Sequence, residues 1–192
     1  MVEAAGETTW ERILRVSADL FAQKGYHGTG LSELTDAIHL GRGGLYHHIR
    51  SKDSLLAQIS RKPIREAADQ AEAIVAQDIT AEEKVVALAR GLVSSIEAQP
   101  SPWIVFFREY SSLPPEYQRE VLEQRERYLY SWEQAVEQGV RAGDFCDDRP
   151  LFLEGLLAFF IYSYIWVNNK GTHEPLGDSL ARFVLRGLRK SL

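Results

Sequence analysis

The sequence of 192 residues contains only one cysteine, Cys146, so no disulfide can form within the chain, and nothing suggests a metal cluster. The N-terminal residues lack the basic start and the apolar run of a secretory signal, so we expect a cytoplasmic protein. Long apolar runs are also scarce. The most apolar stretch, residues 151–167, is at the short limit for a membrane span and contains the costly charge of Glu154. We interpret it as a helix of a soluble protein, buried on nearly every side, and expect no membrane association.

Positive charge is in deficit over the whole chain, whose net charge is −5, and this argues against a protein that coats nucleic acid nonspecifically. Residues 37–52 are an exception, because they contain three Lys or Arg, three His and no acidic residue. A local basic patch on an acidic protein favours a small area of contact with phosphate.

Apolar residues recur at helical spacing, and no stretch alternates apolar and polar residues for long enough to predict a strand. The predicted fold class is therefore all-α. Thr29 and Ser51 are predicted helix caps, Thr80 to Glu83 fits a capping box, and Pro63 is predicted to kink the helix that contains it. We expect nine helices, one of them opening at residue 148 and the others covering about residues 8–24, 30–38, 42–48, 52–77, 80–98, 101–113, 115–142 and 178–192.

Residues 29–49 predict a helix-turn-helix, in which two short helices cross steeply over a small apolar core. The residues available for that core, packed against the first helix, are Leu34, Ile38, Leu40, Leu45 and Ile49. The second short helix also has a thin, polar outer face that suits the major groove. That face consists of Arg42, Gly43, Gly44, His47 and His48.

An ordered set of residues between Trp10 and Leu55 resembles the TetR family of bacterial regulators. The matching residues are Ile13-Leu14, Ala18, Leu20-Phe21, Gly25-Tyr26, Thr29, Leu45-Tyr46-His47-His48, Ser51-Lys52 and Leu55. The resemblance implies a nine-helix fold, with a helix-turn-helix DNA-binding domain at residues 1–51 and a ligand-binding and dimerisation domain at residues 52–192. It also implies a homodimer that binds a palindromic operator.

The same resemblance implies which side chains meet DNA. Thr29 and Lys52 are expected at phosphates, and Arg42 is expected to face the groove. Tyr46 and His47 correspond to positions that contact the phosphate backbone or adjacent bases. Packing alone remains an alternative for Tyr46, and simple solvation for His48. The full predicted DNA-binding set is Thr29, Arg42, Gly43, Gly44, Tyr46, His47, His48 and Lys52.

Three residues depart from the family pattern. His39 occupies a turn position that is usually glycine, so it must adopt a positive φ or alter the turn. Thr35 replaces the usual small alanine of the second helix. Gly44 replaces the usual Thr or Ser before Leu45, which removes one expected contact with DNA. The docking mode is therefore predicted, whereas the operator sequence is not.

Aromatic residues are concentrated in the C-terminal part, where a core and a ligand cavity are both compatible with them. The predicted cavity residues are Trp103, Phe107, Tyr110, Tyr128, Trp132, Phe159, Tyr162 and Trp166, together with Arg125. Arg125 falls within an apolar stripe of the helix at 115–142, so it needs an anion nearby. Glu109, Glu154 or the carboxylate or phosphate of a ligand could supply that anion.

A second, shorter pattern resembles TetR-like regulators of lipid and aromatic catabolism, several of which sense acyl-CoA thioesters. Its residues are Arg108-Glu109-Tyr110, Arg125, Tyr128, Trp132, Gly139, Gly143 and Phe145. The resemblance implies an acyl-CoA effector. The last two helices are expected to form a four-helix dimer contact that includes Leu180, Phe183, Val184, Gly187 and Leu188.

These features predict a transcription regulator, and the resemblance implies a repressor that a small-molecule ligand releases from its operator. An all-α ligand-binding or interaction module that does not bind DNA specifically is the alternative. An enzyme is not predicted, because no catalytic set, metal-ligand spacing or phosphate-binding loop is evident, and no cofactor is expected.

Overall fold

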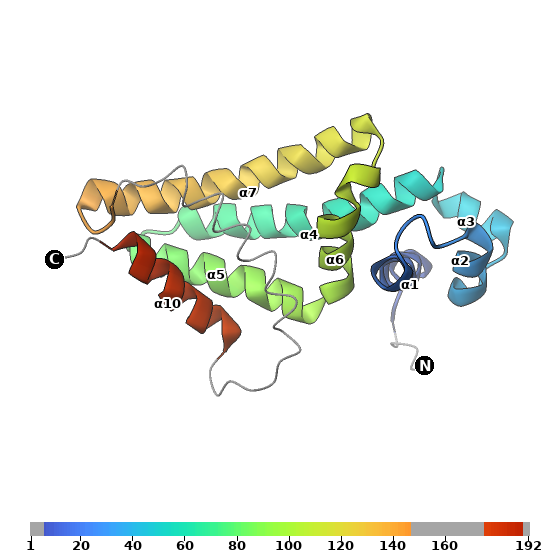
Figure 1. Cartoon of the computed structure of the whole chain (residues 1–192), viewed down its shortest axis with the longest axis horizontal. Helices are drawn as coiled ribbons and strands as arrows, with labels where there is room; N and C mark the ends of the chain where they lie inside the picture. Colours follow the sequence, from blue (N-terminus) through green and yellow to red (C-terminus); the bar gives the residue numbers. More distant parts are fainter. Residues whose placement is uncertain (1–5, 147–174, 190–192) are drawn as a thin grey trace. The chain divides into compact units, whose positions relative to one another are not determined.

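The computed structural model describes residues 6–146 and 175–189. Within these ranges the regular elements are helices, and strand-type pairing is limited to one bridge between Phe145 and Arg189, so the all-α prediction is confirmed. The predicted helix that opens at residue 148 lies outside the described residues. The elements are α1 Thr9–Lys24, α2 Leu31–Ile38, α3 Arg42–His48, α4 Lys52–Val75, α5 Ala81–Ala98, α6 Pro100–Glu109, the 3-10 helix η1 Tyr110–Ser112, α7 Pro115–Ala142 and α10 Leu176–Leu188 (Figure 1).

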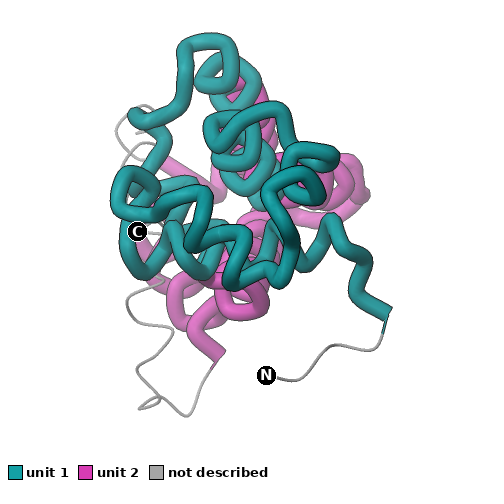
Figure 2. The backbone as a smooth tube through the Cα atoms, turned by 90° about the vertical axis from the view of Figure 1, so that its right-hand side faces the viewer, with its two compact units in different colours: residues 1–63, 101–122 teal, residues 64–100, 123–192 magenta. Residues whose placement is uncertain are grey.

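The chain forms two compact units (Figure 2). Unit 1 contains residues 1–63 and 101–122, and unit 2 contains residues 64–100 and 123–192. Two long helices contribute to both units, because α4 passes from one to the other directly after Pro63 and α7 does so after Leu122. The predicted functional boundary between residues 51 and 52 stays a prediction.

In unit 1, α1–α3 enclose a small apolar core. The N-terminus of α1 is closed by a capping box, in which the Thr8 hydroxyl accepts from the Glu11 amide while the Glu11 carboxylate accepts from the Thr8 amide. Gly25 ends the helix at a φ of 80°, a conformation that glycine adopts without strain. The fully buried side chains of this core are Ile13, Ala18, Phe21, Leu34, Ile38 and Leu45, which confirms most of the predicted set.

In unit 2, α10 packs on α5, whose N-terminus has the predicted capping box of Thr80 and Glu83. Gly139 of α7 lies against the ring of Phe145, and a Cβ atom there would be 2.2 Å from that ring. Packing therefore explains two residues of the acyl-CoA-like pattern, Gly139 and Phe145. The buried ammonium of Lys84 donates to the carbonyl of Val75, at the end of α4, and to Gln138 of α7, each at 2.8 Å.

Three predicted helix starts are wrong, and one of them is that of α10, which begins at Leu176 rather than at residue 178. Thr29 does not cap α2: its hydroxyl donates to the Gly25 carbonyl at 2.9 Å, and the cap residue is Gly30. Helix α6 begins at Pro100 rather than at Ser101. The cap at Ser51 is confirmed, because its hydroxyl accepts from the Ser54 amide at 3.0 Å.

None of the helices in the described ranges combines the length and apolar character needed to cross a membrane. Residues 151–167, the most apolar stretch of the sequence, lie outside those ranges.

Candidate nucleic-acid interface

Helix α3 is almost entirely on the surface of unit 1. Leu45 is its one buried residue, and Ile49, just after the helix, is the second anchor. All the other α3 residues are exposed, including Tyr46 at 49% of its surface. The sequence prediction of a short helix with a free polar face is therefore confirmed, and no acidic residue lies within it.

The turn before α3 shows how the sequence accommodates its departure from the family pattern. His39 ends α2 in the left-handed conformation, with φ 59° and ψ 44°. Its amide and that of Leu40 donate to carbonyls of α2, so the turn closes without a glycine. The predicted positive φ at His39 is confirmed.

Side chains of α3 also contact their surroundings. The guanidinium of Arg42 donates to the hydroxyl of Ser32, at the start of α2, at 2.9 Å. The His47 and His48 rings meet edge to face at 5.4 Å between centroids. Their helix ends in two imidazoles, which suit the negative end of the helix dipole when they are charged.

Glycine occupies two successive positions in α3 for different steric reasons. A Cβ atom on Gly43 would have open space around it. A Cβ atom on Gly44 would touch the Leu40 side chain at 3.6 Å, an ordinary van der Waals contact. A methyl group would therefore lie in the open at residue 43 and against the preceding turn at residue 44.

The two predicted phosphate contacts do not have free side chains. Thr29 is 1% exposed and its hydroxyl is used by the Gly25 carbonyl. The Lys52 ammonium donates to the Tyr26 carbonyl at 2.5 Å and lies 4.1 Å from the centre of the Tyr26 ring. Both side chains stabilise the turn between α1 and α2, and the contacts with phosphate predicted for them stay a prediction.

Burial shapes the electrostatics around Lys52. Burial lowers the pKa of the Lys52 ammonium, although the carboxylates of Asp53 and Glu109 act in the opposite direction. The Tyr26 hydroxyl donates to Asp53, and burial followed by this hydrogen bond raises the pKa of Tyr26. Tyr26 and Lys52 therefore join the α1–α2 turn to the first turn of α4.

The predicted cavity residues of unit 1 lie on α6 and in η1. Trp103 is 1% exposed, and its ring stacks on that of Phe107 at 5.6 Å. The Tyr110 hydroxyl donates to the Gln118 carbonyl at 3.3 Å, and Arg108 donates to the Ala22 carbonyl at the end of α1 at 3.1 Å. Arg108 and Tyr110 of the acyl-CoA-like pattern thus have structural partners in their own unit.

The predicted cavity residues of unit 2 that the structure describes lie on α7. Tyr128 is 3% exposed and Trp132 is fully buried. Burial raises the pKa of the Tyr128 hydroxyl, and its interaction with the Trp132 indole acts in the opposite direction. Phe159, Tyr162 and Trp166 lie outside the described residues.

The expectation of a buried cation at Arg125 is wrong. Arg125 is exposed, whereas its stripe neighbours Val121 and Tyr128 are buried. The side chain makes no hydrogen bond or ion pair with a described residue, so the anion that burial would require is not needed. A separate surface hollow of about 380 Å³ involves none of the predicted cavity residues; it is lined by Thr80, Glu82, Glu83, Val86, Ala87 and Arg90.

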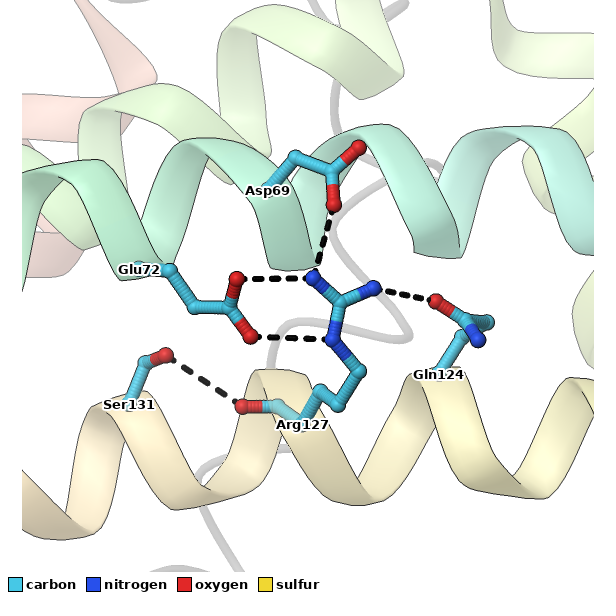
Figure 3. Close-up of polar contacts among 5 residues, drawn as sticks. All are labelled: Asp69, Glu72, Gln124, Arg127 and Ser131. Carbon is cyan, nitrogen blue, oxygen red and sulfur yellow. Dashed lines mark hydrogen bonds and ion pairs between the residues drawn. The ribbon is translucent and has the colours of Figure 1, made fainter.

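The ion pairs of Arg127, on α7, were not predicted from the sequence. The Arg127 guanidinium makes a two-pronged contact with Glu72, at 2.9 and 2.7 Å, and a third bond of 2.8 Å to Asp69 (Figure 3). Gln124 accepts a further bond from it at 2.6 Å. The hydrogen bonds to Glu72 and Asp69 raise the pKa of Arg127. The signal in the sequence was weak, because the acidic partners are more than 50 residues away on α4.

The residues predicted for dimerisation divide between two faces of α10. Leu180, Val184 and Leu188 are buried within the chain, on the face of the helix that packs on α5. Their burial within the chain is observed, and their part in a dimer contact stays a prediction. Phe183, at 63% exposure, and Gly187 lie on the outer face.

Comparisons with known proteins agree with this arrangement. The model for bacterial regulatory proteins of the tetR family matches residues 13–59, and that for tetracyclin repressor-like C-terminal domains matches residues 78–188. The chain is 28% identical over 157 residues to the HTH-type transcriptional repressor KstR2 of Rhodococcus jostii (strain RHA1), a match that covers 81% of this chain and 75% of that one.

Two solved structures show the same fold. A bacterial regulatory protein in the tetR family from Rhodococcus RHA1 has a TM-score of 0.88 at 22% identity, over 96% of this chain and 99% of that one. AibR, solved in complex with isovaleryl coenzyme A and operator DNA, has a TM-score of 0.79 at 22% identity, over 93% and 96%. Because the C-terminal domain model alone matches more than half of the sequence, the chain belongs to the TetR family of transcriptional regulators.

Proposed function

We propose that this chain is a repressor that binds palindromic operator DNA as a homodimer through α3, and that an acyl-CoA ligand releases it. The observation that carries the DNA-binding part is the exposure of α3. Six of its seven residues are outside the core, none is acidic, and Leu45 alone anchors it from within. A short, thin helix of this kind suits the major groove.

The polar face of α3 supplies chemistry for both kinds of DNA contact. Arg42 can read the edge of a guanine, and the hydroxyl of Tyr46 can donate to a phosphate. Gly43 permits a close approach of the backbone, because its surroundings are open. Two-fold symmetry would repeat this face at about 34 Å, one turn of the duplex, or somewhat more. Lys52 and Thr29 support this surface from beneath in our proposal.

The DNA-binding proposal is tested by selection from a random duplex library with the purified full chain. We expect the wild type to select a palindromic sequence and Arg42→Ala to lose about tenfold or more in affinity for it. Arg119→Ala is the matched control, because it removes the same charge from an exposed position outside the interface. Failure of the wild type to select any sequence, or equal losses in both variants, would reject the proposal.

The proposed ligand class is supported by a structural neighbour and by buried aromatic side chains. AibR, which shares the fold, was solved with isovaleryl coenzyme A. Buried aromatic side chains of α7 such as Tyr128 and Trp132 suit an apolar acyl group, and exposed Arg125 of the same helix suits the phosphates of coenzyme A. Calorimetric titration with short acyl-CoAs, coenzyme A and the free acids tests this. We expect thioesters to bind most tightly; equal binding of the free acids would reject the ligand class.

The proposed coupling between ligand and DNA runs along α4. This helix begins in unit 1 beside Tyr26 and continues into unit 2, where Asp69 and Glu72 meet Arg127. Pro63 stands at the division and removes one backbone donor from the helix. A ligand whose binding free energy is a few kcal/mol more favourable for one arrangement of α4 would substantially change the fraction of protein bound to DNA.

A further inference from the structure

Trp10 occupies an unusual place for a large aromatic residue, since it lies in the first turn of α1 and outside the core of that helix. The buried α1 residues are Ile13, Ser17, Ala18 and Phe21, whereas Trp10 is partly exposed. The capping box of Thr8 and Glu11 brackets it, with hydrogen bonds of 2.8 and 3.2 Å. The backbone that carries Trp10 is therefore held firmly, and its side chain is not among the buried residues of α1.

The indole of Trp10 faces the far end of α3. Its ring lies 6.4 Å from that of His48 between centroids, and the two planes are within 23° of parallel. His48 in turn meets His47 edge to face. Three rings thus connect the start of α1 to the last two residues of the helix that we propose enters the groove. Aromatic pairs in offset or edge-to-face geometry stabilise each other beyond the surface they bury.

Helix α3 has little else to hold this end in place. It has seven residues, two of which are glycine, and the hydrogen bond of Arg42 to Ser32 holds its opposite end. Glycine lowers helix stability, and helices this short do not persist alone in water. Leu45 and Ile49 anchor the inner side, so an outer contact is needed to fix how His47 and His48 are presented.

We propose that Trp10 is a positioning residue for DNA recognition, which orients His48 and, through it, His47 on the outer face of α3. This inference rests on the proposed DNA-binding function and deepens it. Trp10 acts through the imidazoles, and its removal therefore affects binding to the cognate duplex more than binding to unrelated DNA.

The test measures affinity by fluorescence anisotropy for the duplex that the wild type selects from a random library and for a scrambled duplex of equal composition. We expect Trp10→Ala to weaken binding to the selected duplex about three- to tenfold and to leave the scrambled duplex unchanged. Trp10→Phe keeps a stacking ring and should restore most of the affinity. In a His48→Ala background, Trp10→Ala should change affinity little, because the pair acts as a unit.

Each other outcome overturns the inference. Equal losses in the presence and absence of His48 would mean that Trp10 acts independently, and equal losses on both duplexes would mean a general defect. A wild type that selects no duplex would reject the proposed function itself, whereas tight binding by Trp10→Ala would reject only the role of Trp10. If Trp10→Ala fails to fold, NMR of the wild type decides: the ring protons of His48 must show the ring-current shift of a stacked indole, which Trp10→Phe reduces.

Discussion

Helices α3 and α10 are both short surface elements to which the sequence assigned an intermolecular role, and they differ in how they meet their own chain. α3 buries only Leu45, so its polar face stays free. α10 buries six of its thirteen residues on the side that packs on α5, including Leu180, Val184 and Leu188. Its outer face retains Phe183 as an exposed apolar side chain.

This difference teaches which surfaces can be predicted from sequence. Polar side chains on a short helix indicate solvent or a polar partner, because burial without partners would be costly. Apolar side chains indicate burial but do not say whose surface covers them. The period of 3.6 residues divides α10 into two apolar edges, and only the structure assigns one of them to α5.

The largest expected effect tests that assignment with two substitutions one residue apart. Val184→Asp places a charge in the contact with α5 and should destabilise the protomer by about 4 kcal/mol or more. Phe183→Asp places the same charge on the outer face and should change protomer stability by only about 0.5 kcal/mol. Urea unfolding measures both. If the chain is a dimer as proposed, Phe183→Asp also shifts its sedimentation toward that of the monomer. Similar losses of unfolding free energy in the two variants would show that the two faces of α10 were assigned wrongly.

Two of the arginines of α7, Arg127 and Arg125, extend the comparison to charged residues. Arg127→Gln removes the bonds to Glu72 and Asp69 and should cost about 1 kcal/mol in urea unfolding, since a bidentate, networked pair exceeds an isolated surface pair. Its effect should shrink as salt concentration rises. Arg125→Gln is the matched control and should change stability by a few tenths of a kcal/mol at most, because the side chain is exposed. A larger cost at Arg125 would contradict its placement.

Local patterns predicted most of the fold, and contacts between distant segments account for what was missed. The bounds of α3, α5 and α7 follow from caps, glycine stops and helical spacing, and the predicted left-handed His39 follows from one departure in a turn. The contacts of Arg127 could not be predicted, because helix spacing does not tell which acidic residues of α4 lie opposite.

The candidate site was predicted unevenly for the same reason. The exposure of Arg42, Tyr46, His47 and His48 follows from their polarity within α3. The inward orientation of Lys52 does not, because a lysine stem reaches either solvent or a neighbouring aromatic ring with little difference in cost. The resemblance implies a contact between Lys52 and a phosphate. In the structure the Lys52 ammonium donates to the Tyr26 carbonyl and lies over the Tyr26 ring.

A smaller effect concerns the two glycines of α3. Gly43→Ala and Gly44→Ala should each stabilise the chain by about 0.5 kcal/mol, because alanine is the better helix former and both sites have room. Only Gly43→Ala should also weaken binding to the selected duplex, since its methyl would stand in open space on the groove side. Thermal unfolding and anisotropy measure the two quantities. Loss of DNA affinity at residue 44 but not at residue 43 would mean that α3 faces the duplex differently.

The smallest expected effect is the pH dependence of two capping boxes, one in α1, which contacts α3 through Trp10, and one in α5, on which α10 packs. Hydrogen bonds from the Thr8 amide and hydroxyl lower the pKa of Glu11, and those from the Thr80 hydroxyl and amide lower the pKa of Glu83. A carboxyl whose pKa is lower in the folded state stabilises that state above its unfolded pKa, and this stabilisation is lost as the pH falls through the folded value. The protection factors of amides in the first turns of α1 and α5, which are exchange rates corrected for the intrinsic pH dependence of exchange, should therefore fall on acidification below pH 4.5, the ordinary value of both groups. Glu11→Gln keeps a capping side chain without a titrating group, so it should flatten the pH dependence in α1 alone and leave α5 unchanged. A flattened profile in both helices would mean that the acid response belongs to the whole chain rather than to each cap.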